Sequence, residues 1–574
     1  MKKPLRFNTI YTIAVISIIM IFITTASAHA KSWSFGVMPD TQWTMPDDGR
    51  NPNSVAVDII NQINQEFINK GVKFVVQVGD LTDNGSNLAL DTRVTYAQAL
   101  YNAGIGFFPL RGNHESSKTA ALEFLRIFPQ TQNGSNNATP LDAFVTTPDD
   151  ANTNPVAPIG HPFTVGSDFS SPSPNLSGLS YSFDFNNARF VLLDQFTRTD
   201  GTGSTNSNII DQQDWISSTL AGKPTDGHAF VFGHKNLIGE NHTDVLFGSD
   251  PSQNAAAQDA FIGSLYNNGV HYYISGHDHT HQNSIIMSPD GTSNVHEIIS
   301  ASDSSKFYIP LGNAELPGTV NNDVKYDNPT RETSISQERD TIGYYIYTID
   351  GPSVTVDYYS AKAYPALDAG EYLIPTTPTL NFIKRETFGY CLNGKEFLVA
   401  QGQSYTSIQD SYKNTAAKIL GGINGSMATD GSGRRFTNAV NTGWSDVTKN
   451  IASDIFTLSG MANNLGSDET DAYTLSITYS SKNMSSADLK KGNFGLATRD
   501  DDGNWINAVV KNFSGKNKFV PGPWNPSYKL GTYGFDQSKN TAWAVINYNS
   551  DFAVAAFKNN QGKEQKSYEL GGNE

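Results

Sequence analysis

Three histidines stand close together near the middle of the chain, in Gly276-His277-Asp278-His279-Thr280-His281. The whole chain has only 11 histidines, so this density is unusual. Imidazole nitrogens and carboxylate oxygens together suit divalent transition metals, and the absence of thiolates here argues against a structural zinc cluster. The stretch therefore indicates a metal site, provided that other ligands approach it.

Four other short segments carry residues of the same kinds. They are Asp40-Thr41-Gln42, Gly79-Asp80-Leu81-Thr82-Asp83, Gly112-Asn113-His114-Glu115 and Gly233-His234. Taken alone, Asp40 is best interpreted as a strand-end cap and His234 as a core histidine with satisfied hydrogen bonds. Each segment, however, follows a run rich in Val, Phe, Tyr and Ile, which predicts a buried strand. If the strands are parallel, their carboxyl ends bring these residues together at one edge of a sheet.

The elements that would position these residues alternate along the chain. Strands are expected over 34–40, 73–80, 105–113, 228–234 and 270–277, and helical spacing of apolar residues predicts helices over 54–70, 95–104, 209–222 and 255–269. This alternation predicts an α/β domain. Residues 180–195 and 344–359 indicate antiparallel hairpins, and the polar stretches 131–178 and 302–342 indicate long insertions.

A second domain is expected beyond a linker at residues 366–384, which contains several Pro and Thr residues. Residues 385–574 show period-two alternation and turn sequences, which predict a β-rich domain, possibly a sandwich. All histidines lie at or before His296, so histidine chemistry belongs to the first domain.

The first 30 residues predict a secretory signal peptide. A basic start precedes a short apolar run, and Ala28-His29-Ala30 fits a cleavage site after Ala30. We therefore expect a secreted or periplasmic protein with no membrane association after cleavage. The net charge of −16 argues against a nucleic-acid partner, because phosphates would be repelled. Cys391 is the only cysteine, so no intrachain disulfide can form.

In their order, the five segments resemble the motifs of the calcineurin-like metallophosphoesterases, a superfamily of dinuclear phosphatases and phosphodiesterases. The superfamily pattern is D-x-H, G-D-x-x-D, G-N-H-D/E, a later His and G-H-x-H; here it becomes DTQ, GDLTD, GNHE, GHK and GHDH. The resemblance covers about residues 33–360 and implies a metallophosphoesterase domain over residues 31–365. The implied fold is α/β, with two mixed β-sheets packed face to face and flanking helices, followed by the separate mostly-β C-terminal domain.

The resemblance also implies a site for two divalent metal ions, which could be Mn, Fe, Zn or Mg. One ion would be bound by Asp40, Gln42, Asp80 and His279, and the other by Asp80, Asn113, His234 and His277. Asp80 would bridge the two. His114 would be the general acid that protonates the leaving oxygen, and Asp83 would orient it.

Two departures from the family pattern bear on the subfamily. Gln42 stands where histidine is usual, and its amide oxygen is a harder, weaker ligand, so this metal could bind more loosely or favour Mn, Mg or ferrous iron. No tyrosine follows Gly79-Asp80; purple acid phosphatases use one there, so that branch is disfavoured. His281 falls outside the pattern and is expected to be exposed or to support a ligand, while Trp43 is expected to pack in the core.

These residues predict a hydrolase of phosphate esters, either a phosphatase or a phosphodiesterase, that acts outside the cytoplasm. A hydroxide held between the two metals would be the nucleophile. The alternative is a surface or glycan-binding protein whose metallophosphoesterase domain is a weakly active or inactive scaffold. In that case a cell-surface or glycan ligand would bind the C-terminal domain.

Overall fold

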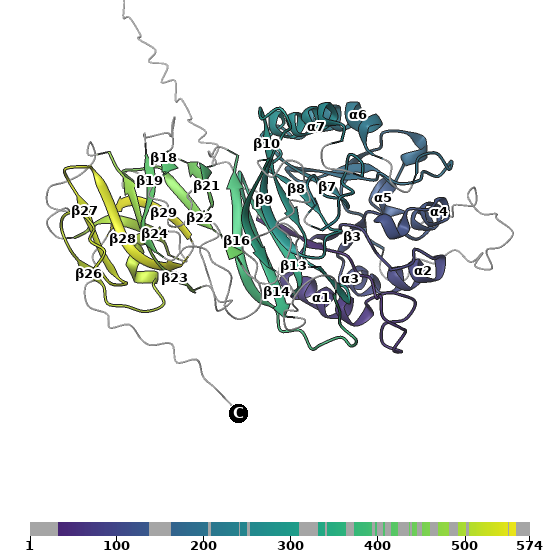
Figure 1. Cartoon of the computed structure of the whole chain (residues 1–574), viewed down its shortest axis with the longest axis horizontal. Helices are drawn as coiled ribbons and strands as arrows, with labels where there is room; N and C mark the ends of the chain where they lie inside the picture. Colours follow the sequence, from purple (N-terminus) through teal and green to yellow (C-terminus); the bar gives the residue numbers. More distant parts are fainter. Residues whose placement is uncertain are drawn as a thin grey trace, which may run out of the picture.

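The fold was obtained as a computed structural model, which describes most of the chain between residues 32 and 557. The described ranges are 32–136, 162–204, 208–239, 241–249, 253–308, 331–338, 341–362, 372–392, 397–398, 406–407, 415–422, 435–436, 439–444, 451–459, 469–480, 492–500, 504–548 and 550–557. The predicted signal peptide lies outside these ranges, as do large parts of both predicted insertions. Figure 1 shows a large lobe of mixed helix and strand beside a smaller lobe of strands.

The first sheet of the large lobe is mixed and has the order β16-β14-β13-β1-β2-β3. Strands β1, β2 and β3 are parallel neighbours, whereas β13, β14 and β16 add on antiparallel. The strands are β1 (Trp33–Met38), β2 (Phe74–Gln77), β3 (Gly106–Pro109), β13 (Thr341–Asp350), β14 (Ser353–Lys362) and β16 (Ile383–Cys391).

The second sheet is also mixed and has the order β20-β12-β9-β10-β8-β7-β6-β5-β4. Its centre, β6-β7-β8-β10, is parallel. The strands are β4 (Ser167–Ser170), β5 (Tyr181–Phe185), β6 (Ala188–Leu193), β7 (His228–Gly233), β8 (Tyr272–Ser275), β9 (His281–Met287), β10 (Asn294–Ile299), β12 (Glu332–Glu338) and β20 (Arg435–Phe436). The predicted hairpins form β5–β6 and β13–β14.

An aromatic core joins the two sheets face to face. Phe35 of β1 lies at its centre: its ring contacts Phe74 and Tyr347 of the first sheet, at centroid distances of 5.4 and 4.8 Å, and Phe190 and Phe230 of the second, at 5.0 and 5.1 Å. Alternate residues of each strand point to this core because successive side chains of a strand lie on opposite faces. The predicted pair of packed mixed sheets is confirmed.

Helices cover the outer face of each sheet. Those on the first sheet are α1 (Val57–Lys70), α2 (Asn87–Thr95), α3 (Gln98–Asn102), α4 (Lys118–Ile127) and α5 (Gln130–Asn133); those on the second are α6 (Gln213–Ala221) and α7 (Ala255–Asn267). The predicted helices correspond to α1, α3, α6 and α7. Helix α1 buries Ile60, Ile63 and Phe67 and ends at Gly71, whose φ of 65° suits the left-handed C-terminal position.

Strand β16 spans residue 385, where the sequence predicts that the second domain begins. Its residues pair with β14 along their whole length, from Ser353↔Cys391 to Ser360↔Ile383. Phe388 and Tyr390 of β16 are buried in the core between the sheets. Residues 385–391 therefore belong to the first sheet, while the division of the chain into domains stays a prediction.

The smaller lobe consists of two six-stranded sheets, ordered β17-β21-β22-β29-β24-β25 and β18-β19-β23-β28-β27-β26. They pack around one core, with Phe456, Leu496 and Val554 from one sheet and Leu475 and Ile546 from the other. The strands are β17 (Phe397–Leu398), β18 (Thr406–Ser407), β19 (Ala416–Gly422), β21 (Ala439–Trp444), β22 (Ile455–Ser459), β23 (Glu469–Thr478), β24 (Phe494–Arg499), β25 (Trp505–Asn507), β26 (Lys518–Phe519), β27 (Thr532–Asp536), β28 (Thr541–Tyr548) and β29 (Ser550–Ala556).

A few short elements complete the described structure. Strands β11 (Lys306–Phe307) and β15 (Tyr372–Leu373) form a two-stranded sheet. The short 3₁₀-helices include η1 (Asn113–Glu115), η2 (Pro174–Leu176), η3 (Ile210–Gln212) and η6 (Ala508–Lys511). None of the helices in the described part of the chain has the length and hydropathy of a membrane-spanning segment.

Candidate metal centre

The five predicted segments meet in space, but they come from two sheets and not from one edge of a single sheet. The loops after β1, β2 and β3 belong to the first sheet, and those after β7 and β8 belong to the second. Backbone contacts join the two sets: His277 N donates to Asp40 Oδ2 at 3.1 Å, and His234 Nδ1 lies 2.9 Å from the Val78 carbonyl oxygen. The carboxyl ends of these strands, from both sheets, therefore lie at a common site.

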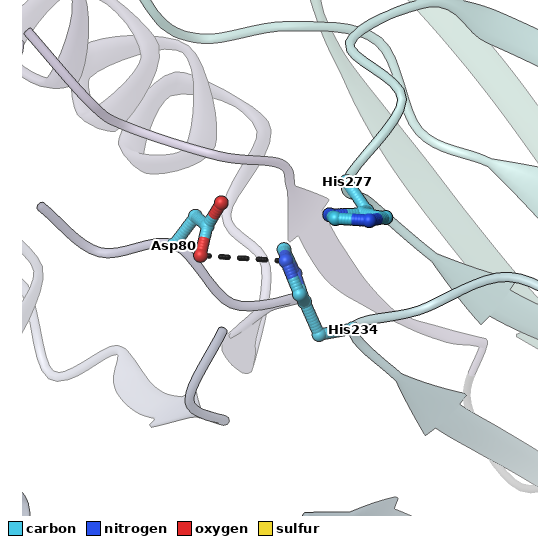
Figure 2. A group of neighbouring side chains, drawn as sticks. All are labelled: Asp80, His234 and His277. Atoms are coloured by element: carbon cyan, nitrogen blue, oxygen red, sulfur yellow. Dashed lines mark ion pairs between the residues drawn. The ribbon is translucent and has the colours of Figure 1, made fainter. Parts of the chain in front are cut away.

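Two triads of ligand-type side chains form the centre of this site. One contains Asp80, His234 and His277 (Figure 2), and the other contains Asp40, Asp80 and His279. Within each triad the ligand atoms lie within 4.8 Å of one another, and all five residues are buried. Asp80 is common to both triads, as the bridging role requires, because two nearby cations need a shared anionic ligand.

The two predicted amide ligands extend these triads. Gln42 is buried; its Nε2 donates to Asp80 Oδ2 at 3.1 Å, while its Oε1 has no hydrogen-bond partner. A buried oxygen without a donor is costly, and a cation would satisfy it. Asn113 Oδ1 lies 2.8 Å from His234 Nε2, so it reaches the Asp80–His234–His277 triad. The donor set, two carboxylates, two amide oxygens and three imidazoles without thiolate, fits two divalent cations.

Hydrogen bonds fix how two of the histidines face the site. His234 Nδ1–H donates to the Val78 carbonyl, and His279 Nδ1–H points to Ser302 Oγ and the Lys306 carbonyl, at 3.0 and 3.1 Å. A proton on Nδ1 leaves the lone pair on Nε2, which is the arrangement that a metal-binding imidazole needs.

Charge in the site also favours bound cations. Burial, reinforced by the nearby charge of Asp80, raises the pKa of Asp40 to about 7 even though His234 opposes this. Burial lowers the tendency of His234 to hold a proton, yet the attraction of Asp80 and Asp40 outweighs burial and raises its pKa to about 9. Two buried carboxylates so close together therefore need compensating positive charge.

Glycines of the motifs allow this close approach. A side chain on Gly112 would overlap Asp80 Oδ1, and one on Gly79, whose φ is 101°, would overlap His234 Nδ1. Asp80, His277 and His279 themselves have positive φ, at 42°, 72° and 50°. Non-glycine residues seldom adopt this backbone region, and such strain is concentrated at functional sites.

His114 lies beside the centre without joining either triad. Its Nε2 is 3.8 Å from Asp80 Oδ2, and its side chain is 24% exposed. Its Nδ1 hydrogen-bonds the backbone carbonyl of Asp83, whereas the Asp83 carboxylate lies 3.6 Å away. Asp83 therefore holds the His114 ring by a main-chain hydrogen bond, and its carboxylate forms a longer ion pair with the same nitrogen.

Glu115 supports the loops that carry two ligands. Its buried carboxylate accepts from Leu81 N (3.2 Å), Thr82 N (3.0 Å), Thr82 Oγ (3.0 Å) and Gly112 N (3.1 Å). These donors are next to Asp80 and Asn113 in the chain, so one side chain holds the loops after β2 and β3 together. Glu115 stands in one of the motifs, but the sequence did not indicate this role.

His242 is a residue of the site that the sequence did not indicate. Its ring lies 4.1 Å from that of His277, and its Nδ1 is 2.6 Å from Asp278 Oδ1. Asp278 also accepts from Asn236 Nδ2 and from the backbone N–H of Asn241 and His242. Burial alone would raise the pKa of Asp278, but the hydrogen bond and charge of His242 lower it to about 2. Asp278 thus anchors the loop after β7 to the loop that bears His277 and His279.

His281 is not exposed. It is buried, with Nδ1 2.8 Å from Tyr345 Oη and Nε2 2.9 Å from Glu386 Oε2. It starts β9, where the chain has already entered the sheet, so its ring points into the core. Trp43 is also buried, in agreement with a packing role.

The match to a protein family covers the segments that carry the candidate ligands. Residues 35–281 match the family model of calcineurin-like phosphoesterases. No curated protein matches the chain. A purple acid phosphatase isolated from yellow lupin (Lupinus luteus) seeds is similar at 14% identity and a TM-score of 0.36, over 60% of this chain and 53% of that one. A dimetal phosphatase from Danio rerio is similar at 16% identity and a TM-score of 0.30, over 56% of this chain and 95% of that one.

The chain thus covers about half the length of the lupin protein. All candidate ligands, from Asp40 to His279, fall inside the matched range, and their loops leave the two packed sheets as described above. Residues 35–281 therefore form a domain of the calcineurin-like phosphoesterase family.

Proposed function

We propose that this protein is a metal-dependent hydrolase of phosphate esters, a phosphatase or phosphodiesterase, that acts outside the cytoplasm. The observation that carries the proposal is the pair of buried triads that share Asp80. Support for the location comes only from the signal-like sequence that ends at Ala30.

The site residues would have two roles, cation binding and proton transfer. Asp40, Gln42, Asp80, Asn113, His234, His277 and His279 would hold two divalent cations, which would neutralise phosphate charge and lower the pKa of water. His114 stands outside the ligand set, with Nε2 facing Asp80 and Nδ1 held by the Asp83 carbonyl. These contacts support a role for His114 as the donor of a proton from Nε2 to the departing ester oxygen.

Two substitutions separate these roles. Asp80→Asn removes the charge shared by both triads, so metal content and hydrolysis of an aryl phosphate should fall together. His114→Ala should keep the metal content but slow turnover about 10²–10⁴-fold, the usual contribution of a general acid. The deficit should be small for acidic phenols, which leave without a proton, and largest for alkyl esters.

His271→Ala is a matched control, because His271 stacks on Tyr390 at a centroid distance of 3.8 Å, away from both triads. It should change neither metal content nor rate. Metal binding without turnover of any phosphate ester would refute the proposal and favour the alternative of a binding protein with an inactive domain. A His114→Ala deficit that is equal for all leaving groups would show that His114 positions phosphate and is not the acid.

A further inference from the structure

Two apolar side chains, three positions apart in sequence, are exposed on the C-terminal lobe. Val510 of η6 is 47% exposed, and Phe513, just after η6, is 52% exposed. Their backbone is nevertheless fixed to β28, because Phe513 N donates to Asn547 Oδ1 at 3.2 Å and Asn512 Nδ2 donates to the Val545 carbonyl at 3.2 Å. The lobe therefore presents these apolar groups to solvent from an ordered loop.

Three exposed lysines gather around Gly531, at the start of β27. Lys518 N donates to the Gly531 carbonyl at 3.0 Å, and Thr532 N donates to the Lys529 carbonyl at 3.0 Å. A Cβ on Gly531 would lie 2.6 Å from the Lys516 carbonyl oxygen, so the chain at Lys516 runs directly beside Gly531. All three lysine side chains are exposed.

The segments that carry the apolar pair and the lysines are attached to the same residue of β28. The Val545 carbonyl accepts from Gly531 N at 3.0 Å as well as from Asn512 Nδ2, so both groups are fixed to the same point of β28. We call Val510, Phe513, Lys516, Lys518 and Lys529 the β26–β28 surface. Strand β26 lies toward the end of the small lobe that faces away from the large lobe (Figure 1).

The charge of this segment is opposite to that of the whole chain. Residues 503–535 contain four lysines and no Asp or Glu, although the chain has a net charge of −16. Among the described residues, no salt bridge is formed by Lys516, Lys518 or Lys529. Glu469 approaches from β23, where its carboxylate accepts from Asn547 Nδ2 at 2.9 Å.

We infer that the β26–β28 surface binds the surface of an anionic phospholipid bilayer. Each lysine beside an anionic membrane raises the membrane affinity of a protein about fivefold. An exposed aromatic or aliphatic side chain raises this affinity further when it enters the interfacial layer. An acidic polysaccharide in solution could use the lysines, but it would not need Val510 and Phe513. The protein would bind at the membrane surface without crossing the bilayer. This proposal revises the expectation from the sequence that the protein has no membrane association. It does not depend on the proposed function.

Co-sedimentation with vesicles tests the inference. The chain starting at Lys31, which lacks the apolar run at residues 13–23, should bind vesicles of phosphatidylglycerol and phosphatidylcholine but not vesicles of phosphatidylcholine alone. Replacing Lys516, Lys518 and Lys529 by Gln should weaken binding about 100-fold, from about fivefold for each lysine. Phe513→Ser should weaken it several-fold while leaving the dependence on salt unchanged.

Two controls match these variants. Lys539→Gln removes an exposed lysine at the opposite end of β27, and Leu88→Ser removes an exposed apolar side chain of the large lobe. Neither should change vesicle binding. Equal binding to both kinds of vesicle, or unchanged binding by the triple lysine variant, would overturn the inference. The inference would also be overturned if the protein bound a soluble acidic polysaccharide but no vesicles, and if Phe513→Ser left that polysaccharide binding unchanged.

Discussion

Glu115 offers the sharpest test of how the loops hold the metal centre. Its two carboxylate oxygens accept four hydrogen bonds, from Leu81 N, Thr82 N, Thr82 Oγ and Gly112 N. The side chain is buried, so water cannot replace these bonds. Glu115→Gln keeps the size of the side chain but turns one acceptor oxygen into an amide donor that faces N–H groups.

The expected loss of stability follows from the number of hydrogen bonds that the substitution removes. One oxygen remains in the variant, so about two of the four donors lose their partner. A hydrogen bond to a charged group contributes about 1.5–3 kcal/mol, which gives a loss of about 3–6 kcal/mol in the free energy of unfolding. Because the donors adjoin Asp80 and Asn113, metal affinity should also fall, by about 10–100-fold as for other residues that support ligands.

Urea unfolding with a chelator present measures the first quantity, and competition with a metal indicator measures the second. Glu123→Gln is the control, because Glu123 accepts from Arg126 Nε at 2.8 Å on α4 and touches no candidate ligand. It should lower stability and leave metal affinity unchanged. If Glu115→Gln destabilises the fold but binds both metals as tightly as the wild type, the carboxylate does not position the ligand loops and our reasoning is wrong.

Four other changes probe the large lobe. Gln42→His should tighten zinc binding in a metal titration, because imidazole is a softer ligand than an amide oxygen; unchanged affinity would mean that Gln42 does not face the ion. Gly112→Ala should lower metal affinity about 10–100-fold in competition with a metal indicator, since its Cβ would overlap Asp80 Oδ1. Burial lowers the pKa of His228 from 6.5 to about 4, so the unfolded state takes up the proton first and stability falls as pH drops from 6.5 to 4. His228→Gln should remove up to about 3 kcal/mol of that fall in urea unfolding across this range. A chain that ends at residue 375 should be about 3–6 kcal/mol less stable to urea than one that ends at 392, because it loses two buried aromatic side chains of β16.

The candidate ligands could be predicted because each follows a strand that the sequence marks clearly. Val75 and Val76 of β2 are buried in the sheet, and Asp80 comes just after. The segment order then implied the ligand sets, and the structure places Asp40, Asp80 and His279 in one triad. The segments did not show which of their strands belong to which of the two sheets that the resemblance implies, because strand order depends on long-range pairing such as that of β1 with β13.

The supporting contacts could not be predicted, because they depend on loops distant in sequence. His242 meets Asp278 across 36 residues, and it lies in a polar loop with no periodicity. The pairing of residues 385–391 with β14 could not be predicted for a similar reason. The residues of β16 alternate as in any antiparallel strand, so their pattern could not show whether they pair with β14 or with the later strands.

The motifs themselves contain both ligands and their supports, which explains their compact form. In Gly112-Asn113-His114-Glu115, the asparagine reaches His234 while the glutamate bonds the neighbouring loop. In His277-Asp278-His279, the two histidines belong to different triads, and the aspartate between them anchors the loop of His242. Positive φ at both histidines turns this short stretch so that they serve neighbouring positions. Moving the histidines alone to another scaffold should therefore give a weaker site, because Asp278 and the strained turn would be missing.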